Sequence, residues 1–238
     1  MSCFVSLILG VYSLGSAAAL DTHQLVKLLE ARYRGAQTLQ ATFLERYLEN
    51  DRVARSEAGV AYFQRPGRMR WEYESPERNL FLVDGKMAWF YVPEDHTVTR
   101  VPEKQSTDWR TPLALLAGEM KLSRICARVE LAPAEKPSTA GDVVLYCPLR
   151  GTKDKQQIGS GEAPEMQDEG PEQTVYLEVV PGTGDLARIL VRERGGVEIE
   201  FKFVDWRINP PIPVSLFRFD VPPGVAIVDG ESPAESRP

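Results

Sequence analysis

The sequence predicts a mainly β protein of the α+β class, in which a curved antiparallel sheet is partly covered by short helices. Three observations point to this class. Apolar and polar residues alternate with period two through much of residues 38–101 and again in the last third of the chain. Tight-turn signals such as Asp84-Gly85 separate apolar runs, as in an antiparallel meander. Only residues 21–35 and 111–125 have the apolar spacing of helices.

The first of these helices has clear start and stop signals. Asp21 can cap its N-terminus, and Gln24 three residues later completes a capping box. Gly35 suits the C-terminal exit. The apolar side chains fall on one stripe, which predicts that the helix packs on the sheet: Leu25, Leu28, Leu29 and Tyr33.

The second helical stretch begins with Pro112, which fits a first helical turn, and we expect one or two short helices there. Around them, the alternation predicts strands at residues 38–49, 53–64, 68–74, 78–84, 87–92, 96–101, 126–132 and 142–148. The clean alternation of residues 197–206 predicts another strand. After the Pro-rich break at 210–213, we expect a last short strand through Phe217, Phe219 and Val221.

The domain organisation is simple. Residues 1–19 lack charge, are apolar through Leu14 and end in a run of small residues, which predicts a cleaved signal peptide and a mature protein outside the cytoplasm. Residues 20–238 then form one domain, with a mobile polar insertion at 150–172 and a frayed tail at 230–238.

The charge and the cysteines restrict the partners and the compartment. The formal net charge of −6 argues against nucleic acid as a partner. Cys126 and Cys147 lie near opposite ends of two predicted consecutive strands, so a hairpin would bring them to the same end of the ladder. In an oxidising compartment this arrangement favours a structural disulfide. The alternative is two separately buried thiols.

No constellation of residues indicates catalysis or metal binding. His23 and His96 are far apart in the sequence, whereas the ligands of a metal site are clustered. We therefore interpret both as surface residues. Glu72 and Glu74 share a strand face but alternate with the aromatic residues, so a solvated face is the better interpretation. The sequence therefore predicts no enzyme, no metal and no cofactor.

The sequence has more apolar residues in its predicted strands than one covered sheet face would need. Residues 80–92 are apolar on both strand faces, which in an antiparallel sheet means that both faces are covered. The predicted helices are too short to cover a large sheet. One interpretation is an ordinary core. The other is an apolar hollow with a charged latch at its rim, because the basic turn Arg65-Pro66-Gly67-Arg68 comes just before Met69, Trp71 and Tyr73.

Several stretches together resemble the LolA-type outer-membrane lipoprotein carriers. The resemblance begins at TLQATFLERY, continues through GVAYFQRPGRMRWEY, VDGKMAWFYVPEDHTVTRV and TPLALLAG, and ends at FVDWRINPPIPVSLFRFDVPPGVAIVD. These blocks span nearly the whole chain after residue 19. The combination of R-P-x-x-x-x-W, D-G-K-x-x-W-x-Y and T-P-L-x-L-L is specific. Met69 departs from the phenylalanine that the family usually has there.

The resemblance implies an incomplete antiparallel β-barrel, or half-barrel, whose short helices form a lid over an apolar cavity. It implies that Arg65 fastens the lid. It also implies a periplasmic carrier of acylated lipoproteins that is loaded by an inner-membrane ATP-driven transporter and unloaded at an outer-membrane receptor. We expect a monomer whose cavity residues bind acyl chains: Phe63, Met69, Trp71, Leu82, Trp89, Tyr91, Leu113 and Leu116.

The sequence leaves two alternatives to a carrier open. The same half-barrel could sense lipids or lipoproteins without any shuttle role. An enzyme on this fold is disfavoured, because no catalytic constellation is found.

Overall fold

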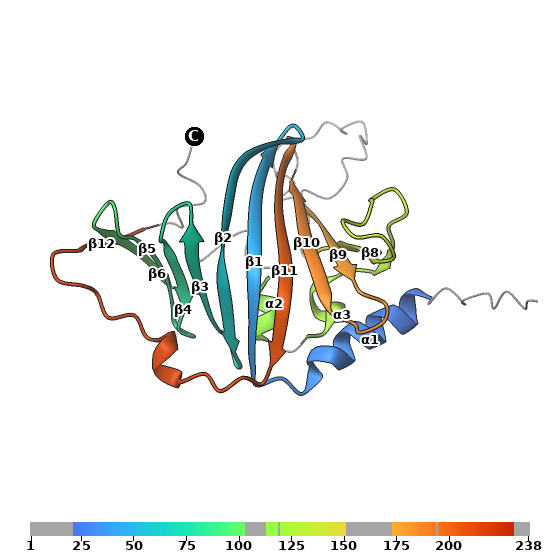
Figure 1. Cartoon of the computed structure of the whole chain (residues 1–238), viewed down its shortest axis with the longest axis horizontal. Coiled ribbons are helices and arrows are strands. Elements are labelled where there is room, and N and C mark those ends of the chain that lie inside the picture. Colours follow the sequence, from blue (N-terminus) through green and yellow to red (C-terminus); the bar gives the residue numbers. More distant parts are fainter. Residues whose placement is uncertain (1–20, 103–112, 119, 151–172, 194, 231–238) are drawn as a thin grey trace, which may run out of the picture.

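The computed structural model describes residues 21–102, 113–118, 120–150, 173–193 and 195–230. The predicted signal peptide, all but Arg150 of the predicted insertion, and all but Gly230 of the predicted tail lie outside the described residues. Twelve strands form one sheet in the order β12-β6-β5-β4-β3-β2-β1-β11-β10-β9-β8-β7 (Figure 1). The first and last strands of this order are open edges, so the sheet is not closed into a barrel.

The strands are β1 (Thr38–Glu49), β2 (Arg52–Gln64), β3 (Arg68–Ser75), β4 (Leu80–Val83), β5 (Met87–Val92), β6 (Thr97–Pro102), β7 (Glu130–Leu131), β8 (Val143–Pro148), β9 (Gln173–Val179), β10 (Leu186–Glu193), β11 (Val197–Ile208) and β12 (Ala226–Asp229). Strands β1 to β6 form the predicted antiparallel meander, within two residues of the expected bounds. The mainly β fold class predicted from the sequence is confirmed.

The sheet curves because several strand pairs change register. The shift between Ala58 and Gly59 in β2 lies where the backbones of β2 and β3 approach closely. A Cβ atom at position 59 would lie 1.9 Å from the carbonyl oxygen of Glu72, so only glycine fits there. Further shifts occur in β1 and between β9 and β10. Such bulges increase the local twist and bend the sheet.

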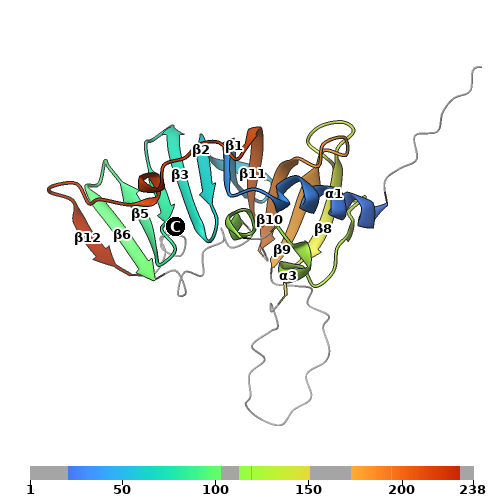
Figure 2. The same ribbon diagram turned by 90° about the horizontal axis from the view of Figure 1, so that it is seen from below.

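Helix α1 (Thr22–Arg34) begins with the predicted capping box. The Asp21 carboxylate accepts a hydrogen bond from the Gln24 N–H at 2.7 Å, and the Gln24 side chain accepts one from the Asp21 N–H. The helix lies at the end of the sheet that is far from β12 (Figure 2). Leu25, Leu29 and Tyr33 are fully buried beneath it.

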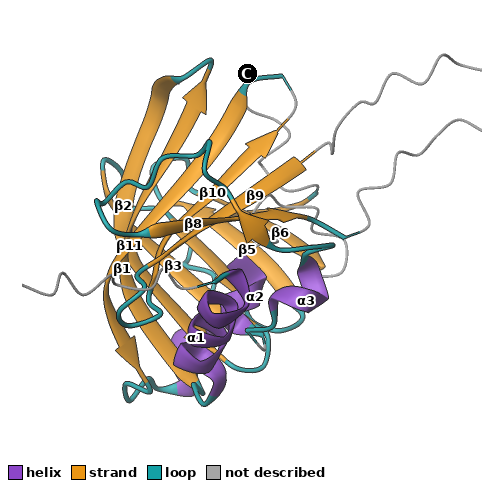
Figure 3. Ribbon diagram, turned by 90° about the vertical axis from the view of Figure 1, so that its right-hand side faces the viewer, coloured by secondary structure: helices purple, strands orange, loops and turns teal. Residues whose placement is uncertain are grey.

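Two further helices, α2 (Ala114–Ala117) and α3 (Leu122–Ile125), lie with α1 in one group (Figure 3). Helix α1 contacts α3 directly, because the Glu30 carboxylate accepts a hydrogen bond from the Leu122 N–H at 3.0 Å. Helix α2 packs against β2 and β3. None of the helices in the described ranges is both long and apolar enough to cross a membrane.

The predicted disulfide is present: Cys126 and Cys147 are bonded, with a Cα–Cα distance of 5.1 Å. The hairpin around it is shorter than expected, since β7 has two residues instead of the predicted 126–132. Cys126 itself pairs with Leu149 in an isolated bridge. The disulfide therefore joins the end of α3 to β8.

The C-terminal segment differs from the prediction. Phe217 does not begin a strand, but ends the short 3-10 helix η3 (Val214–Phe217). The last strand is β12, which pairs with β6 in parallel. The proline residues at 210–213 carry the chain away from β11, so residues 213–219 can run across β3 to β5 before β12 forms.

Charged residues are buried on one face of β9, β10 and β11, in the part of the sheet that lies far from β12. The Arg188 guanidinium pairs with the carboxylates of Glu178 at 2.6 Å and Glu200 at 3.4 Å. The N–H and hydroxyl groups of Ser138 also donate to Glu178, at 2.9 and 2.8 Å. The loop at residues 132–142 is thereby fixed to β9 and β10.

Candidate functional site

The strand register separates the apolar residues of β3, β4 and β5 onto two faces. Side chains directly opposite each other on paired strands point to the same side of a sheet. Trp71 lies opposite Ala61 and Phe81, and Phe81 lies opposite Phe90. We call the side of the sheet that carries these residues the inner face. The outer face carries Arg70, Leu82 and Trp89, which form the next row of partners.

Trp71 is the centre of an aromatic cluster on the inner face. It is fully buried. Its ring lies edge-on to four phenylalanine rings, with centroid distances of 4.7 Å to Phe43, 5.7 Å to Phe63, 5.5 Å to Phe201 and 6.1 Å to Phe203. Such pairs stabilise one another beyond the area they bury. The inner face therefore has a wide aromatic floor contributed by β1, β2, β3 and β11.

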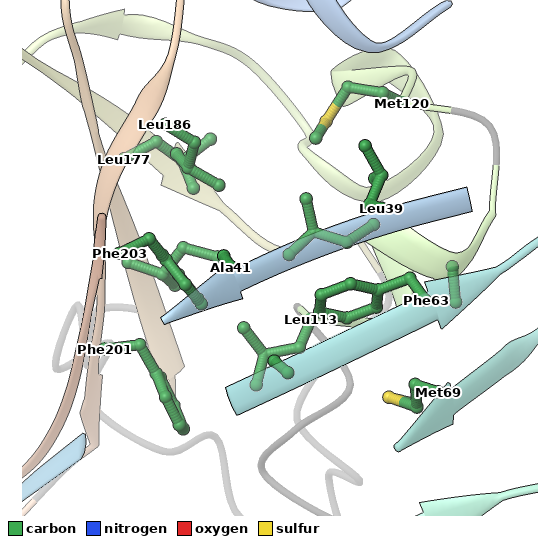
Figure 4. Packing of buried hydrophobic residues seen from close by; sticks show 14 of the residues in the cluster. Leu39, Ala41, Phe63, Met69, Leu113, Met120, Leu177, Leu186, Phe201 and Phe203 are labelled. Carbon is green, nitrogen blue, oxygen red and sulfur yellow. The ribbon is translucent and has the colours of Figure 1, made fainter. Parts of the chain in front are cut away.

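Residues 113–117, which we call the lid, cover this floor. The side chains of Leu113 and Leu116 are fully buried. In the close-up of Figure 4, Leu113 lies among the side chains of the same core cluster, with Phe63 and Phe201 nearby in the view. The carbonyl oxygen of Ala117, at the end of the lid, accepts a hydrogen bond from the Gly67 N–H at 3.0 Å. The turn between β2 and β3 thus holds the end of the lid.

Arg65 lies in the same turn and binds the C-terminal end of α1. Its Nη1 atom donates to the carbonyl oxygen of Tyr33 at 2.9 Å and, more weakly, to that of Arg34 at 3.5 Å. The last carbonyl groups of a helix lack partners within the helix, so a side-chain donor satisfies them. The turn at residues 65–67 therefore connects the end of α1 to the end of the lid.

Tyr33 is held from two sides. Its hydroxyl oxygen accepts a hydrogen bond from the Leu186 N–H at 3.0 Å, and its ring lies edge-on to Trp206 at 5.3 Å. Burial raises the pKa of the Tyr33 hydroxyl well above its usual value. The phenol stays neutral, and the carbonyl that receives Arg65 has a fixed position.

Five of the eight residues predicted to bind acyl chains lie together at the inner face: Phe63, Met69, Trp71, Leu113 and Leu116. All five belong to one buried cluster. They contribute the floor from β2 and β3 and the underside of the lid. The sequence placed these residues correctly relative to one another.

The other three, Leu82, Trp89 and Tyr91, lie on the outer face and cannot share a binding site with the first five. Leu82 is paired with Arg70 and Trp89, and Tyr91 with Leu80. Phe219 contacts the rings of both Trp89 and Tyr91 at 5.5 Å. The prediction of a single cavity was wrong for these three residues. The strands that carry them are apolar on both faces, and the C-terminal segment covers the second face.

Other residues of the site were missed. Phe43, Phe81, Phe201 and Phe203 belong to the inner cluster. The alternation of residues 197–206 predicts a strand, but no local signal indicates that β11 pairs with β1, which lies about 150 residues earlier. Register could have indicated Phe81, because it is the partner of Trp71.

The side chains gathered on the inner face are apolar, as an apolar ligand would require. Within the described ranges, no three His, Cys, Asp or Glu side chains are grouped so that they could hold a metal ion. Asp84 lies in the turn between β4 and β5. Partial burial by itself would raise the pKa of its carboxyl group. Hydrogen bonds from the N–H groups of Met87, the Trp89 indole and Lys86 outweigh this effect, and the pKa lies below its usual value. Asp84 therefore fixes the β4–β5 turn as an anion.

The described structure is an unclosed sheet whose apolar inner face lies beneath short helices. Comparison with known proteins identifies the family. The model of the family described as outer membrane lipoprotein carrier protein LolA matches residues 34–140. The outer-membrane lipoprotein carrier protein of Pseudomonas paraeruginosa is 28% identical over 220 residues, which cover 90% of this chain and 91% of that protein.

The comparisons also found a second relative and a solved structure. The outer-membrane lipoprotein carrier protein of Nitrosospira multiformis is 27% identical over 214 residues, covering 84% of this chain and 86% of that protein. A LolA superfamily protein from Nitrosomonas europaea, with a TM-score of 0.43 and 12% identity, covers 84% of this chain and 99% of its own. The chain belongs to the LolA family of outer-membrane lipoprotein carrier proteins, which is a family of carriers and not of enzymes.

Proposed function

We propose that this carrier binds the acyl chains of lipoproteins on its inner face and takes them from an inner-membrane ATP-driven transporter to an outer-membrane receptor. One observation supports acyl binding above all. The aromatic floor around Trp71 is covered by a lid of five residues that packs on it through the buried side chains of Leu113 and Leu116, and the hydrogen bond from Gly67 to the carbonyl oxygen of Ala117 holds the end of the lid. A cover of this kind can be removed without breaking the sheet.

The energetics favour a carrier with partners. Each buried methylene group is worth about 0.8 kcal/mol, so a long acyl chain in water is disfavoured by roughly 10 kcal/mol or more. A lipoprotein therefore needs a protein cover to cross an aqueous space. A cavity that only imitates the membrane cannot extract lipid from it, so loading requires the ATP-driven transporter and unloading requires the receptor.

Arg65 acts as a latch in this proposal. In the closed state its guanidinium donates to the end of α1, and hydrogen bonds from a charged donor are worth about 1.5–3 kcal/mol each. Incoming acyl chains displace the lid together with the turn at residues 65–67, to which the end of the lid is bonded, and so break these bonds. Their re-formation then favours the empty, closed state and helps the cargo to leave at the receptor.

The compartment follows from the family and the disulfide. LolA-family carriers are periplasmic, and the Cys126–Cys147 bridge fits an oxidising compartment. Residues 1–19 are proposed as the signal peptide that directs the chain there. The carrier is proposed to act as a monomer.

A reconstituted transfer assay tests the proposal. Membrane vesicles that contain the transporter and a labelled lipoprotein are incubated with ATP and the purified protein, and label is followed into solution and then into receptor-bearing vesicles. A carrier brings the lipoprotein into solution in a complex with itself. A protein that only senses lipoproteins leaves the label in the donor vesicles, which would refute the carrier function.

Arg65→Leu tests the latch in the same assay. We expect this variant to fold and to accept lipoprotein, but to release much less of it to the receptor. Arg68→Leu is a matched control, because Arg68 directly follows the turn, at the start of β3, but donates to Gln64 and to the carbonyl oxygen of Asp84. Normal release by Arg65→Leu would remove Arg65 from the mechanism.

A further inference from the structure

The indole N–H of Trp71 is a buried donor without a partner. Trp71 has no exposed surface, and within the described part of the chain no acceptor lies within hydrogen-bond distance of its Nε1 atom. Leaving such a donor unsatisfied is costly, and a buried tryptophan usually finds an acceptor. Phenylalanine rings surround it on four sides, so packing alone would be served by another apolar ring.

The other two tryptophans that the structure describes do have acceptors. Trp206 Nε1 donates to the carbonyl oxygen of Leu186 at 2.8 Å. Trp89 Nε1 donates to the Asp84 carboxylate at 3.1 Å. The orphan donor therefore occurs at the tryptophan that lies under the lid, on the face proposed to receive acyl chains. A buried polar group without a partner calls for an explanation, and a ligand group is one.

We infer that Trp71 Nε1 donates a hydrogen bond to an acyl carbonyl of the bound cargo. The inference rests on the proposed function, because it assumes that acyl chains reach the inner face. An acyl chain is attached to its lipid through an ester or an amide, and the carbonyl oxygen of either group accepts hydrogen bonds. When the chain leaves water, this oxygen loses its hydration, as the indole N–H already has. Pairing the two satisfies both groups at once.

This pairing gives the hollow a chemical preference. A purely apolar hollow distinguishes chains by length and shape, whereas a single buried donor distinguishes an acyl chain from an alkyl chain of the same length. The hydrogen bond would also fix how deeply the chain enters, because it would hold the carbonyl group beside Trp71 at the centre of the floor. Trp71 would then be a specificity-determining residue as well as a part of the floor.

Three synthetic lipopeptides of equal chain length test the inference. The first carries two ester-linked chains, the second carries two ether-linked chains, and the third carries the ether-linked chains with an additional N-linked acyl amide. We expect the wild-type protein to bind the diester about tenfold more tightly than the diether, which corresponds to about 1.4 kcal/mol. The third probe separates the two sources of a carbonyl: binding as tight as the diester assigns the amide as a second acceptor.

Trp71→Phe keeps an aromatic ring and removes the donor. We expect its diester-to-diether affinity ratio to fall to about one. Trp89→Phe is the matched control, since it removes an indole N–H from the outer face and should keep the tenfold ratio. An unchanged ratio in Trp71→Phe overturns the inference, whereas binding of none of the three probes by the wild type overturns the proposed function itself.

A second measurement needs no variant and covers the case in which Trp71→Phe does not fold. The indole N–H proton of Trp71 can be identified in the wild-type protein by NMR through its contacts with the Phe43 and Phe201 rings. We expect this resonance to move downfield when the diester binds and to stay upfield with the diether. Equal positions in the two complexes would exclude a hydrogen bond to the ester carbonyl.

Discussion

The two faces of strands β3 to β5 are both apolar, but their covers are held in different ways. On the outer face, residues 213–219 pack on Trp89 and Tyr91 through Phe219. This cover is held by a hydrogen bond of 3.1 Å from Arg70 to the carbonyl oxygen of Leu216, by the wedge of Phe219 and by the β6–β12 ladder that follows. On the inner face, the lid is short and is held chiefly by packing and by the turn at residues 65–67.

The difference indicates that one cover is permanent and the other is removable. A segment anchored at several points along its length opens only when the sheet unfolds, whereas a one-turn helix can leave in a local transition. We therefore propose that the same strands serve a structural core on one side and a ligand site on the other. The following substitutions test this division.

The largest effect is expected for Phe217→Ala. Phe217 is buried at the end of η3, and truncating a buried phenylalanine costs about 3–5 kcal/mol. We expect the free energy of unfolding, measured by urea denaturation, to fall by about 3 kcal/mol. The affinity of the folded protein for an acyl probe should not change. Val214→Ala is the control, because Val214 is 61% exposed. A large loss of acyl affinity in Phe217→Ala would show that the outer face also binds cargo.

An intermediate effect is expected for Glu30→Ala. The Glu30 carboxylate accepts the Leu122 N–H and so joins α1 to α3 on the inner side. Loss of a capping acceptor costs about 1 kcal/mol. We expect faster hydrogen exchange in residues 120–126 and quicker uptake of an acyl probe, with little change in global stability. Lys27→Ala, on the exposed side of α1, should have neither effect. Unchanged exchange in residues 120–126 would contradict a role of Glu30 in holding α3 on α1.

The smallest effect concerns Asp84, which fixes the turn next to the outer cover through Trp89. Because its pKa is depressed in the folded protein, its contribution to stability is complete above the usual aspartate value of about 3.9 and is lost as the pH falls through the lower, folded pKa. Asp84→Asn should therefore lower the Tm at pH 7 and approach the wild type in acid. A difference in Tm that widens below pH 4 would contradict this sign.

The sequence predicted the elements whose signals are local. The capping box of α1, the six-strand meander and the turn at Asp84 depend on residues a few positions apart, and the structure has all three. The site could be predicted in part from the sequence, since the alternation in their strands places Phe63, Met69 and Trp71 on one face.

Two features depend on distant residues and could not be predicted. The period-two pattern of residues 80–92 carries no information on which apolar face lies beneath which cover, because both faces are buried. The outer cover comes from Phe217 and Phe219, more than 120 residues later, and the floor is completed by Phe201 and Phe203 of β11. Only the pairing of β1 with β11 brings the latter beside Trp71.

Photo-crosslinking from two adjacent residues tests the central claim most directly. Phe90 and Tyr91 are neighbours in β5, but Phe90 packs against the inner cluster and Tyr91 contacts Phe219 on the outer face. Each is replaced in turn by p-benzoylphenylalanine, the protein is loaded with a lipoprotein, and the acyl chains are examined for the covalent adduct. We predict an adduct from position 90 and none from position 91. An adduct from position 91 of similar yield would contradict the assignment of the inner face as the acyl-binding site.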